Sequence, residues 1–193
     1  MTTDRETIEK IIAGDTLQFR VVIEQYKRLV YNIAFRMVPN AADREDLCQD
    51  VFVKVYQNLS SFQFESMLST WIARIAFNTC VNHLKKKRVP LFHDFMPEKV
   101  SVEDFGDLAK SPYEEMEHTD IAGKIEIEIE KLPAVFRTIL TLFHLEQMSY
   151  EEIGKTMAMP AGTVKSYLFR ARKLLKERLT RHYVQEELWE RGI

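Results

Sequence analysis

The sequence is poor in the residues that build membrane spans, disulfide frameworks and flexible loops. Its 193 residues include only two cysteines, six glycines and six prolines. No window approaches the roughly 18 consecutive apolar residues that a membrane span needs. The charged N-terminus, MTTDRETIEK, also lacks the apolar stretch of a signal peptide. We therefore expect a cytoplasmic protein with no membrane span of its own.

The scarcity of cysteine and glycine also argues against an enzyme. Cys48 and Cys80 lie in apolar helical patterns without C-x-x-C spacing, which predicts buried, reduced thiols rather than a disulfide or a metal site. We find no nucleophile and base pair, no zinc spacing and no glycine loop that would cradle a phosphate. A lone E-x-x-H at Glu115 to His118 lacks the further carboxylates of a carboxylate-bridged metal centre. We expect no catalytic residues, no metal and no cofactor.

Charge is present in normal amount but is unevenly distributed. The formal net charge is only -2, yet residues 162–182 hold seven basic residues against one acidic. Residues 89–119 hold two basic residues against eight acidic. A basic segment of this kind is the electrostatic footprint of nucleic-acid binding, so the near-neutral total does not exclude a DNA-binding protein.

Apolar residues recur at three- and four-residue steps through most of the chain, which predicts an all-α fold. One helix is expected from Phe19 to Met37, ending before Pro39 and Asn40. The next is expected to have Asp43 as its cap, and a further helix should run from about Ser69 to Arg88. Residues 89–119, with three prolines and no sustained period, are predicted to be a flexible acidic linker between two helical domains.

A polar stripe on the helix after Asp43 has three interpretations. At about 100° per residue, Asp46, Gln49 and Asp50 share a face turned away from the apolar positions. The stripe is either a solvated face with acids near the helix N-terminus, a docking surface for a basic partner, or carboxylates for a metal or acid-base chemistry. The last has little support, because no histidine or second acidic cluster lies at ligand spacing.

The segment from Ser60 to Arg88 has a composition suited to single-stranded DNA. Phe62 and Phe64 in the loop are either anchors folded onto the core or part of a cradle for an unstacked base. One face of the following helix mixes groups for stacking, base-edge hydrogen bonding and phosphate contact. That face carries Trp71, Arg74, Asn78, Asn82 and Lys85. The basic run at its end also suits the negative end of a helix dipole.

The C-terminal part of the chain predicts a helix-turn-helix. The alternating stretch Lys124 to Glu130 fits a strand or a helix, and we choose a helix because Pro133 follows so closely. Ser149 and Glu152 form a capping box for a short helix ending near Met157. The long final helix presents polar and basic residues outward, with an exposed aromatic that plain solvation does not explain. These are Lys165, Ser166, Phe169, Arg170 and Lys173.

Four blocks of the sequence together resemble the extracytoplasmic-function (ECF) sigma factors, small members of the sigma-70 family of bacterial RNA polymerase. The blocks are DREDLCQDVFVKVY (43–56), STWIARIAFNTCVNHLKKKR (69–88), KLPAVFRTILTLFHLEQMSYEEIG (131–154) and PAGTVKSYLFRARKLL (160–175). The resemblance implies a non-enzymatic factor that binds core polymerase and directs promoter-specific initiation. It implies a first domain over residues 1–88, a linker over 89–119, a helix-turn-helix domain over 120–183 and a tail over 184–193.

The resemblance also assigns roles to the candidate residues. Asp46, Gln49 and Asp50 are expected to contact the beta-prime clamp helices of core polymerase, which has the beta subunit as a further partner. Residues expected at the minus-ten promoter element are Ser61, Phe62, Phe64, Trp71, Arg74, Asn78, Asn82 and Lys85. Residues expected at the minus-thirty-five element are Thr163, Lys165, Ser166, Phe169, Arg170, Arg172 and Lys173. An anti-sigma factor is a further expected partner.

Some features depart from the family pattern. Arg44 stands where a small residue is usual, and Tyr167 replaces a common basic residue, which we expect to remove one phosphate contact. The tail around Trp189 has no assigned counterpart. The competing hypothesis is a stand-alone helix-turn-helix regulator that binds duplex DNA as a dimer, but it leaves the acidic stripe and the Trp71 to Lys85 face unexplained.

Overall fold

The computed structural model describes residues 2–87 and 121–181, and every regular element in these two ranges is helical. The all-α prediction is confirmed. The elements are α1 (Thr2–Ile12), η1 (Thr16–Gln18), α2 (Phe19–Met37), α3 (Ala41–Asn58), η2 (Leu59–Ser61), α4 (Leu68–Lys86), α5 (Ile121–Glu130), α6 (Ala134–His144), α7 (Tyr150–Met157) and α8 (Ala161–Leu179). The predicted linker, the Glu115 to His118 motif and the tail around Trp189 lie outside the described residues.

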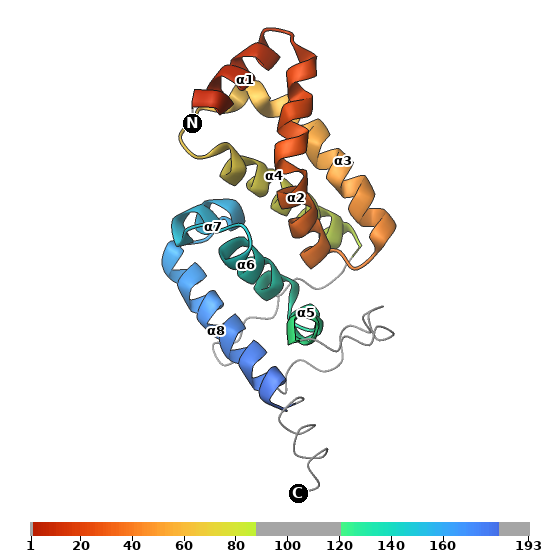
Figure 1. Cartoon of the computed structure of the whole chain (residues 1–193), viewed down its shortest axis with the longest axis vertical. Coiled ribbons are helices and arrows are strands. Elements are labelled where there is room, and N and C mark those ends of the chain that lie inside the picture. The colour runs from red at the N-terminus through yellow and green to blue at the C-terminus, as the bar shows by residue number, and fades with distance from the viewer. Residues whose placement is uncertain (1, 88–120, 182–193) are drawn as a thin grey trace, which may run out of the picture.

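The helices form two bodies (Figure 1). The first body contains α1 to α4, in which α2, α3 and α4 pack on one another. The second body contains α5 to α8, in which α8 packs on α5, α6 and α7. Each body has an apolar interior made by the residues that recur at helical spacing. Fully buried examples are Ile33, Val55, Ile72 and Ala76 in the first body, and Ile139, Leu142, Ile153 and Leu168 in the second.

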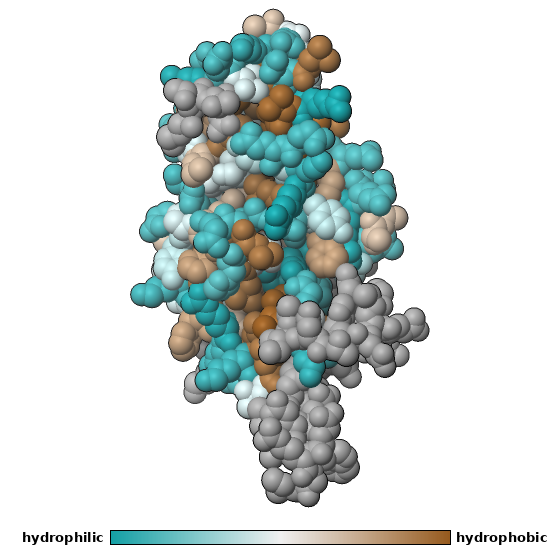
Figure 2. Space-filling model, viewed as in Figure 1, coloured by the Kyte–Doolittle hydropathy of each residue, from teal (hydrophilic) through white to brown (hydrophobic). Residues whose placement is uncertain are grey.

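The two bodies also pack directly against each other. The contacts run from α2 to α6 and from α4 to α7, as the adjacent ribbons in Figure 1 show. Hydrophilic side chains cover most of the face in Figure 2, and the hydrophobic ones lie mainly in the seams between helices. Sequence periodicity predicted two helical units but gave no sign of this contact.

The connection between α2 and α3 differs from its predicted form. Asn40 is the N-cap of α3, because its side-chain oxygen accepts a hydrogen bond from the Asp43 backbone N–H at 3.0 Å. The prediction that Asp43 is the cap is therefore wrong. Asp43 instead accepts a hydrogen bond from Lys87 Nζ at 2.6 Å, which lowers the pKa of its carboxyl group. Arg44 donates to the carbonyls of Val38 and Pro39, both at 2.6 Å, and so ties this turn to α3.

Several local predictions in the second body are confirmed. The Lys124 to Glu130 stretch is helical, in α5. Pro133 is the N-cap of α6, where its missing N–H costs nothing. At the start of α7, the Ser149 hydroxyl accepts from the Glu152 N–H, and the Glu152 carboxylate accepts from the Ser149 N–H at 2.8 Å. The Ser149 backbone N–H is the main reason that the pKa of Glu152 lies below its usual value.

Candidate nucleic-acid and partner interfaces

The acidic stripe lies on an open face of α3. Asp46, Gln49 and Asp50 are exposed, while Leu47, Val51 and Val55 of the same helix are buried. Two exposed apolar residues continue the stripe along the helix: Val53 is 54% exposed and Tyr56 is 43% exposed. The face therefore combines negative charge with apolar area, a composition that suits a protein partner better than DNA. These two residues were not predicted from the sequence, although their helical spacing from Asp46 and Asp50 was a usable signal.

The loop before α4 contains an aromatic cluster. Phe62 is only 7% exposed, and its ring centroid lies 4.8 Å from that of Phe64 and 5.3 Å from that of Trp71. The guanidinium of Arg5 lies 4.7 Å from the centre of the Phe64 ring. The geometry of Phe62 is that of a core anchor, whereas Phe64 and Trp71 are half-buried at the cluster edge. The neighbouring Ser61 is exposed.

Phe64 has an unusual backbone. Its φ is 57°, in the left-handed region that bulky side chains rarely adopt. The aromatic contacts with Phe62 and Arg5 hold it there. Backbone strain of this kind costs on the order of 1 to 3 kcal/mol and concentrates at binding sites. The left-handed backbone of Phe64 therefore marks this loop as a candidate binding site.

The remaining members of the α4 set form one continuous exposed row. Arg74, Asn78, Asn82 and Lys85 follow one another at intervals of three and four residues, and all four are exposed. Opposite them, Ile72, Ala76 and Cys80 are buried, and burial raises the pKa of the Cys80 thiol to about 12. Two amides flanked by two cations can hydrogen-bond base edges and contact phosphates at once.

The helix-turn-helix is formed by α7 and α8. Between them, Ala158 has left-handed backbone angles (φ 54°, ψ 46°) and ends α7. Gly154 makes the close approach of the two helices possible, because a Cβ there would lie 2.7 Å from the Met159 carbonyl oxygen. The turn between α7 and α8 therefore depends on a left-handed residue at 158 and on the lack of a side chain at 154.

The outer face of α8 carries most of the expected DNA-reading residues. Lys165, Ser166 and Phe169 are exposed, with 69% of Phe169 open to solvent, and Lys173 is exposed one turn further on. Thr163 and Arg170 are half-buried. Such a face offers a hydroxyl, an aromatic and cations near the helix N-terminus, where recognition helices contact bases.

Two residues of α8 have surroundings that the sequence did not predict. Tyr167 is buried against Phe136, with ring centroids 6.0 Å apart, so its side chain packs in the interior of the second body. The prediction that it removes one phosphate contact stays a prediction. Arg172 lies over the Phe143 ring at 5.0 Å, and its Nη2 is 3.2 Å from His144 Nε2. Burial and the charge of Arg172 lower the pKa of His144. Arg172 therefore braces α8 against α6 while it stays exposed.

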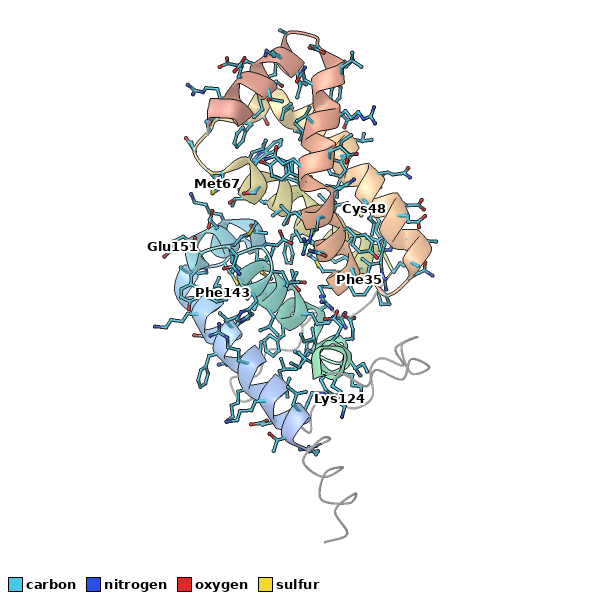
Figure 3. The ribbon with its side chains drawn as sticks, viewed as in Figure 1. Phe35, Cys48, Met67, Lys124, Phe143 and Glu151 are labelled. Atoms are coloured by element: carbon cyan, nitrogen blue, oxygen red, sulfur yellow. The ribbon has the colours of Figure 1, made fainter. Side chains whose placement is uncertain are left out.

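The packing of the two bodies brings Arg74, expected at the minus-ten element, next to the helix-turn-helix, expected at the minus-thirty-five element. Arg74 of α4 lines a groove with Glu151 and Lys155 of α7 and with Pro160 and Ala161 at the start of α8. The Thr70 hydroxyl, one turn before Arg74, donates to the Glu152 carboxylate at 3.4 Å. Figure 3 shows Glu151 on α7 and Met67, just before α4, on the side of the molecule where these helices meet.

Metal-binding clusters and membrane-spanning helices are absent from residues 2–87 and 121–181. No group of three or more histidine, cysteine, aspartate or glutamate side chains is arranged to hold a metal ion in these ranges. None of the described helices combines the length and apolar composition of a membrane span.

Comparison with known proteins gives matches over both bodies. Residues 22–89 match the family model of Sigma-70 region 2, and residues 122–175 match that of Sigma-70, region 4. RNA polymerase sigma-H factor of Pseudomonas aeruginosa is 34% identical over 181 residues, covering 91% of this chain and 93% of that protein. ECF RNA polymerase sigma-E factor of Escherichia coli is 34% identical over 181 residues, with coverage of 92% and 94%.

Two solved structures of similar fold are complexes. CnrH in complex with the cytosolic domain of CnrY superposes with a TM-score of 0.63 at 18% identity, over 93% of this chain and 98% of that one. The sigma factor RpoE in complex with the anti-sigma factor NepR from Bartonella quintana gives 0.61 at 22% identity, over 84% and 96%. At this level of identity the likeness is one of fold.

Proposed function

Because the chain belongs to the ECF sigma factors of the sigma-70 family, and is thus an RNA polymerase sigma factor that directs transcription initiation, we propose how its surfaces divide that work. The family is non-enzymatic, so each role is one of binding. The first body, within residues 1–88, docks on core polymerase and holds the opened minus-ten element. The second body, within residues 120–183, binds the minus-thirty-five element as duplex.

The observation that carries this division is the contrast between two neighbouring helices of the first body. The exposed face of α3 has Asp46 and Asp50 with the apolar Val53, whereas the exposed row of α4 runs from Arg74 to Lys85. An acidic face repels DNA and attracts a basic protein surface, and a row of amides and cations does the reverse. The first body thus has one face for polymerase and another for DNA.

At the minus-ten element we assign separate roles to the loop and the helix. Phe64 and Trp71 supply the edge of an aromatic cluster on which an unstacked base can lie, with Ser61 beside it, and Phe62 supports them from the core. Base and aromatic stacking contributes about 1 to 3 kcal/mol per base. Opening DNA costs about 1.4 kcal/mol per base-pair step, so one or two captured bases offset part of that cost. The row of Arg74, Asn78, Asn82 and Lys85 then holds the strand.

At the minus-thirty-five element, α8 enters the major groove. Lys165, Ser166 and Phe169 face the bases, and Arg170 hydrogen-bonds a base edge from its half-buried position. Thr163, Arg172 and Lys173 contact the backbone or position the helix. Both faces lie on structured helices, which fixes their side chains better than loops would.

We further assign an anti-sigma factor as a partner and the cytoplasm as the location. Proteins of similar fold were solved in complexes, one of them with a protein named as an anti-sigma factor. Such a partner would cover the open acidic and apolar face of α3 or the exposed row of α4.

The experiment that tests the central proposal is in vitro transcription from a library of genomic fragments with bacterial core polymerase and this protein. Specific initiation supports it, whereas duplex binding as a symmetric dimer without initiation supports the stand-alone regulator.

The docking role of α3 predicts the effect of charge reversal. We expect Asp46→Arg combined with Asp50→Arg to abolish binding to core polymerase, because the reversed charges repel a basic docking surface. A pull-down with tagged core measures the loss, and circular dichroism confirms intact helicity. The matched control is Glu9→Arg with Glu24→Arg, which reverses two exposed charges on α1 and α2. Equal binding by the variant and the control would contradict the docking role.

The base-reading role of α8 predicts a sequence-dependent loss. We expect Arg170→Ala to weaken binding to the cognate minus-thirty-five duplex by on the order of 1 to 3 kcal/mol, while binding to unrelated duplexes changes little. Fluorescence anisotropy on both duplexes measures the difference. Lys176→Ala, on the same helix, serves as the control for a general loss of positive charge. A uniform loss over all sequences would make Arg170 a phosphate contact instead.

A further inference from the structure

The first helix packs against the loop that carries the aromatic cluster. We call residues 62–67, between η2 and α4, the aromatic loop. α1 contacts η2, which leads directly into this loop, and Figure 1 shows α1 beside the end of α3, where η2 begins. Ile8 and Ile11 anchor α1, because both side chains are buried in the first body. α1 therefore supports the aromatic loop from one side.

One exposed side chain of α1 reaches the aromatic loop. The guanidinium carbon of Arg5 lies 4.7 Å from the centre of the Phe64 ring. At this distance a cation is attracted by the electron-rich face of an aromatic ring. Arg5 is exposed and Phe64 is half-buried. The contact therefore lies at the outer edge of the aromatic cluster, where a DNA base can reach it.

Phe64 connects Arg5 to the rest of the aromatic cluster. Its ring centroid lies 4.8 Å from that of Phe62, and the Phe62 centroid lies 5.3 Å from that of Trp71. Trp71 belongs to the first turn of α4, the helix whose exposed row we assign to the minus-ten strand. The contacts thus run from α1, across the aromatic loop, to the proposed DNA-binding helix.

The backbone of Phe64 makes these contacts important. A φ of 57° is unfavourable for a bulky side chain, and such a conformation persists only where the surroundings compensate for it. Phe62 contacts the ring from within the loop, whereas Arg5 contacts it from another helix. Loss of the Arg5 contact would therefore allow the loop to relax and the Phe64 ring to leave its observed position.

We propose that Arg5 is a positioning residue for the minus-ten site: its guanidinium holds the Phe64 ring in the orientation in which the ring receives an unstacked base. The inference rests on the proposed function of the aromatic loop. It extends the site to α1, which precedes the residues 22–89 that match Sigma-70 region 2. Binding side chains keep their productive orientation through supporting contacts of this kind.

The first measurement is the affinity of the holoenzyme for opened DNA. The probe is a fork-junction DNA whose single-stranded overhang carries the minus-ten segment of a promoter recovered by the transcription experiment. Arg5→Ala should weaken binding by about two- to fivefold, the range for loss of an exposed cation–π contact. The matched control is Lys10→Ala, which removes a cation of the same helix that pairs with Glu6 at 2.9 Å. The control should bind as the wild type does.

A double-mutant cycle distinguishes positioning from direct contact with DNA. If Arg5 acts through Phe64, Arg5→Ala should have no further effect once Phe64→Leu has removed the ring. If Arg5 contacts the DNA itself, the losses from the two substitutions add, and the positioning role is overturned.

A fluorescent base shows which part of the strand depends on Arg5. In the overhang, 2-aminopurine replaces one base at a time, and its fluorescence is quenched where it stacks on the aromatic cluster. Arg5→Ala should reduce the quenching at that one position and leave the others unchanged. A general loss of structure would instead alter all positions together, and that result would contradict a positioning role.

Tryptophan fluorescence tests the same role without DNA. The chain has two tryptophans, so Trp71 alone reports on the aromatic cluster in a Trp189→Phe background. Arg5→Ala should increase the quenching of Trp71 by acrylamide in the free full chain, because a displaced Phe64 ring uncovers Phe62 and Trp71. Helicity by circular dichroism should stay unchanged, and Lys10→Ala should leave the quenching at the wild-type level.

The outcomes separate this inference from the function on which it rests. If the wild type initiates transcription but Arg5→Ala matches Lys10→Ala in both binding and quenching, the positioning role is overturned and the proposed function stands. If the wild type fails to initiate, the proposed function falls, and the acrylamide comparison still decides whether Arg5 holds the Phe64 ring. If Arg5→Ala loses helicity, Arg5→Gln replaces it, because glutamine removes the charge but keeps a long side chain.

Discussion

The two bodies differ in where they bury charge. Within the described residues two charged side chains are buried, Arg36 in the first body and Glu128 in the second. Glu128 pairs with Lys131 at 3.0 Å and with Arg178 at 3.2 Å, and so ties α5 to α8 inside one body. Arg36 has its carboxylate partners in the other body. One buried charge therefore belongs to the fold of a body and the other belongs to an association between bodies.

This difference shows that burial alone does not identify a charge that stabilises the fold of its own body. If the bodies separate, Glu128 keeps its partners, whereas Arg36 exchanges them for water. The remaining interior of the first body is apolar or holds bonded threonines, such as Thr79, which accepts from Lys54 Nζ at 3.1 Å. We therefore expect the first body to depend on packing and the second to depend partly on an internal ion pair.

The largest expected effect comes from a cavity in the first body. Ile72 is fully buried, so Ile72→Ala should destabilise this body by about 2 to 5 kcal/mol. Native-state hydrogen exchange followed by mass spectrometry measures the opening free energy of each body separately. Val53→Ala, at an exposed position on α3, is the control. Equal loss of protection in both bodies would show that they unfold as one unit and would remove the basis of the comparison.

A smaller effect is expected when the internal ion pair of the second body is broken. Glu128→Gln takes the counter-charge from Arg178 and Lys131, which remain partly exposed, so the cost should be about 1 to 3 kcal/mol. Exchange in α5 and α8 should accelerate, and exchange in α2 to α4 should not. In small-angle X-ray scattering, the radius of gyration of this variant should remain that of the wild type, because Glu128 pairs with groups inside the second body. Expansion would mean that Glu128 also contributes to the association of the bodies.

The smallest expected effect is a gain in stability at the turn between α7 and α8. Ala158 ends α7 with left-handed backbone angles, which glycine adopts without steric cost. Ala158→Gly should stabilise the second body by about 0.5 to 1 kcal/mol and leave the first unchanged. Denaturant unfolding checks the sign, with Ala171→Gly in the interior of α8 as a control that should destabilise. Destabilisation by Ala158→Gly would mean that the Ala158 methyl group makes a packing contact that outweighs the strain.

The helices and their local signals could be predicted from the sequence. The apolar face of α2, the capping box of α7 and the outward position of Phe169 follow from spacing and residue chemistry within one segment. The cap of α3 was mistaken because Asn40 and Asp43 are both good capping residues three positions apart, and only the backbone geometry distinguishes them.

The contact between the bodies could not be predicted in the same way. Periodicity shows that a helix face is buried but not against what it is buried. Arg36 near the end of α2 has the pattern of a cation near a helix C-terminus, and Glu126 and Glu130 occur in an alternating stretch whose charges look solvated. Their pairing joins residues about 90 positions apart in the sequence, as the separation of 94 between Arg36 and Glu130 shows. The burial of Tyr167 was not predicted for a similar reason, because it depends on the contact of its ring with Phe136 of another helix.

Because the backbone is tightly packed at Gly154, a small change in the turn between α7 and α8 would be amplified along α8. The 19 residues of α8 extend about 28 Å from this turn at about 1.5 Å per residue. A Cβ at residue 154 would lie 2.7 Å from the Met159 carbonyl oxygen, so the backbone at the turn would have to shift. For a helix of this length, a rotation of about 10° at the turn moves the far end by roughly 5 Å. That displacement exceeds the rise of one base pair, about 3.4 Å. The absence of a side chain at Gly154 thus permits the observed direction of α8, on which the proposed contacts with bases depend.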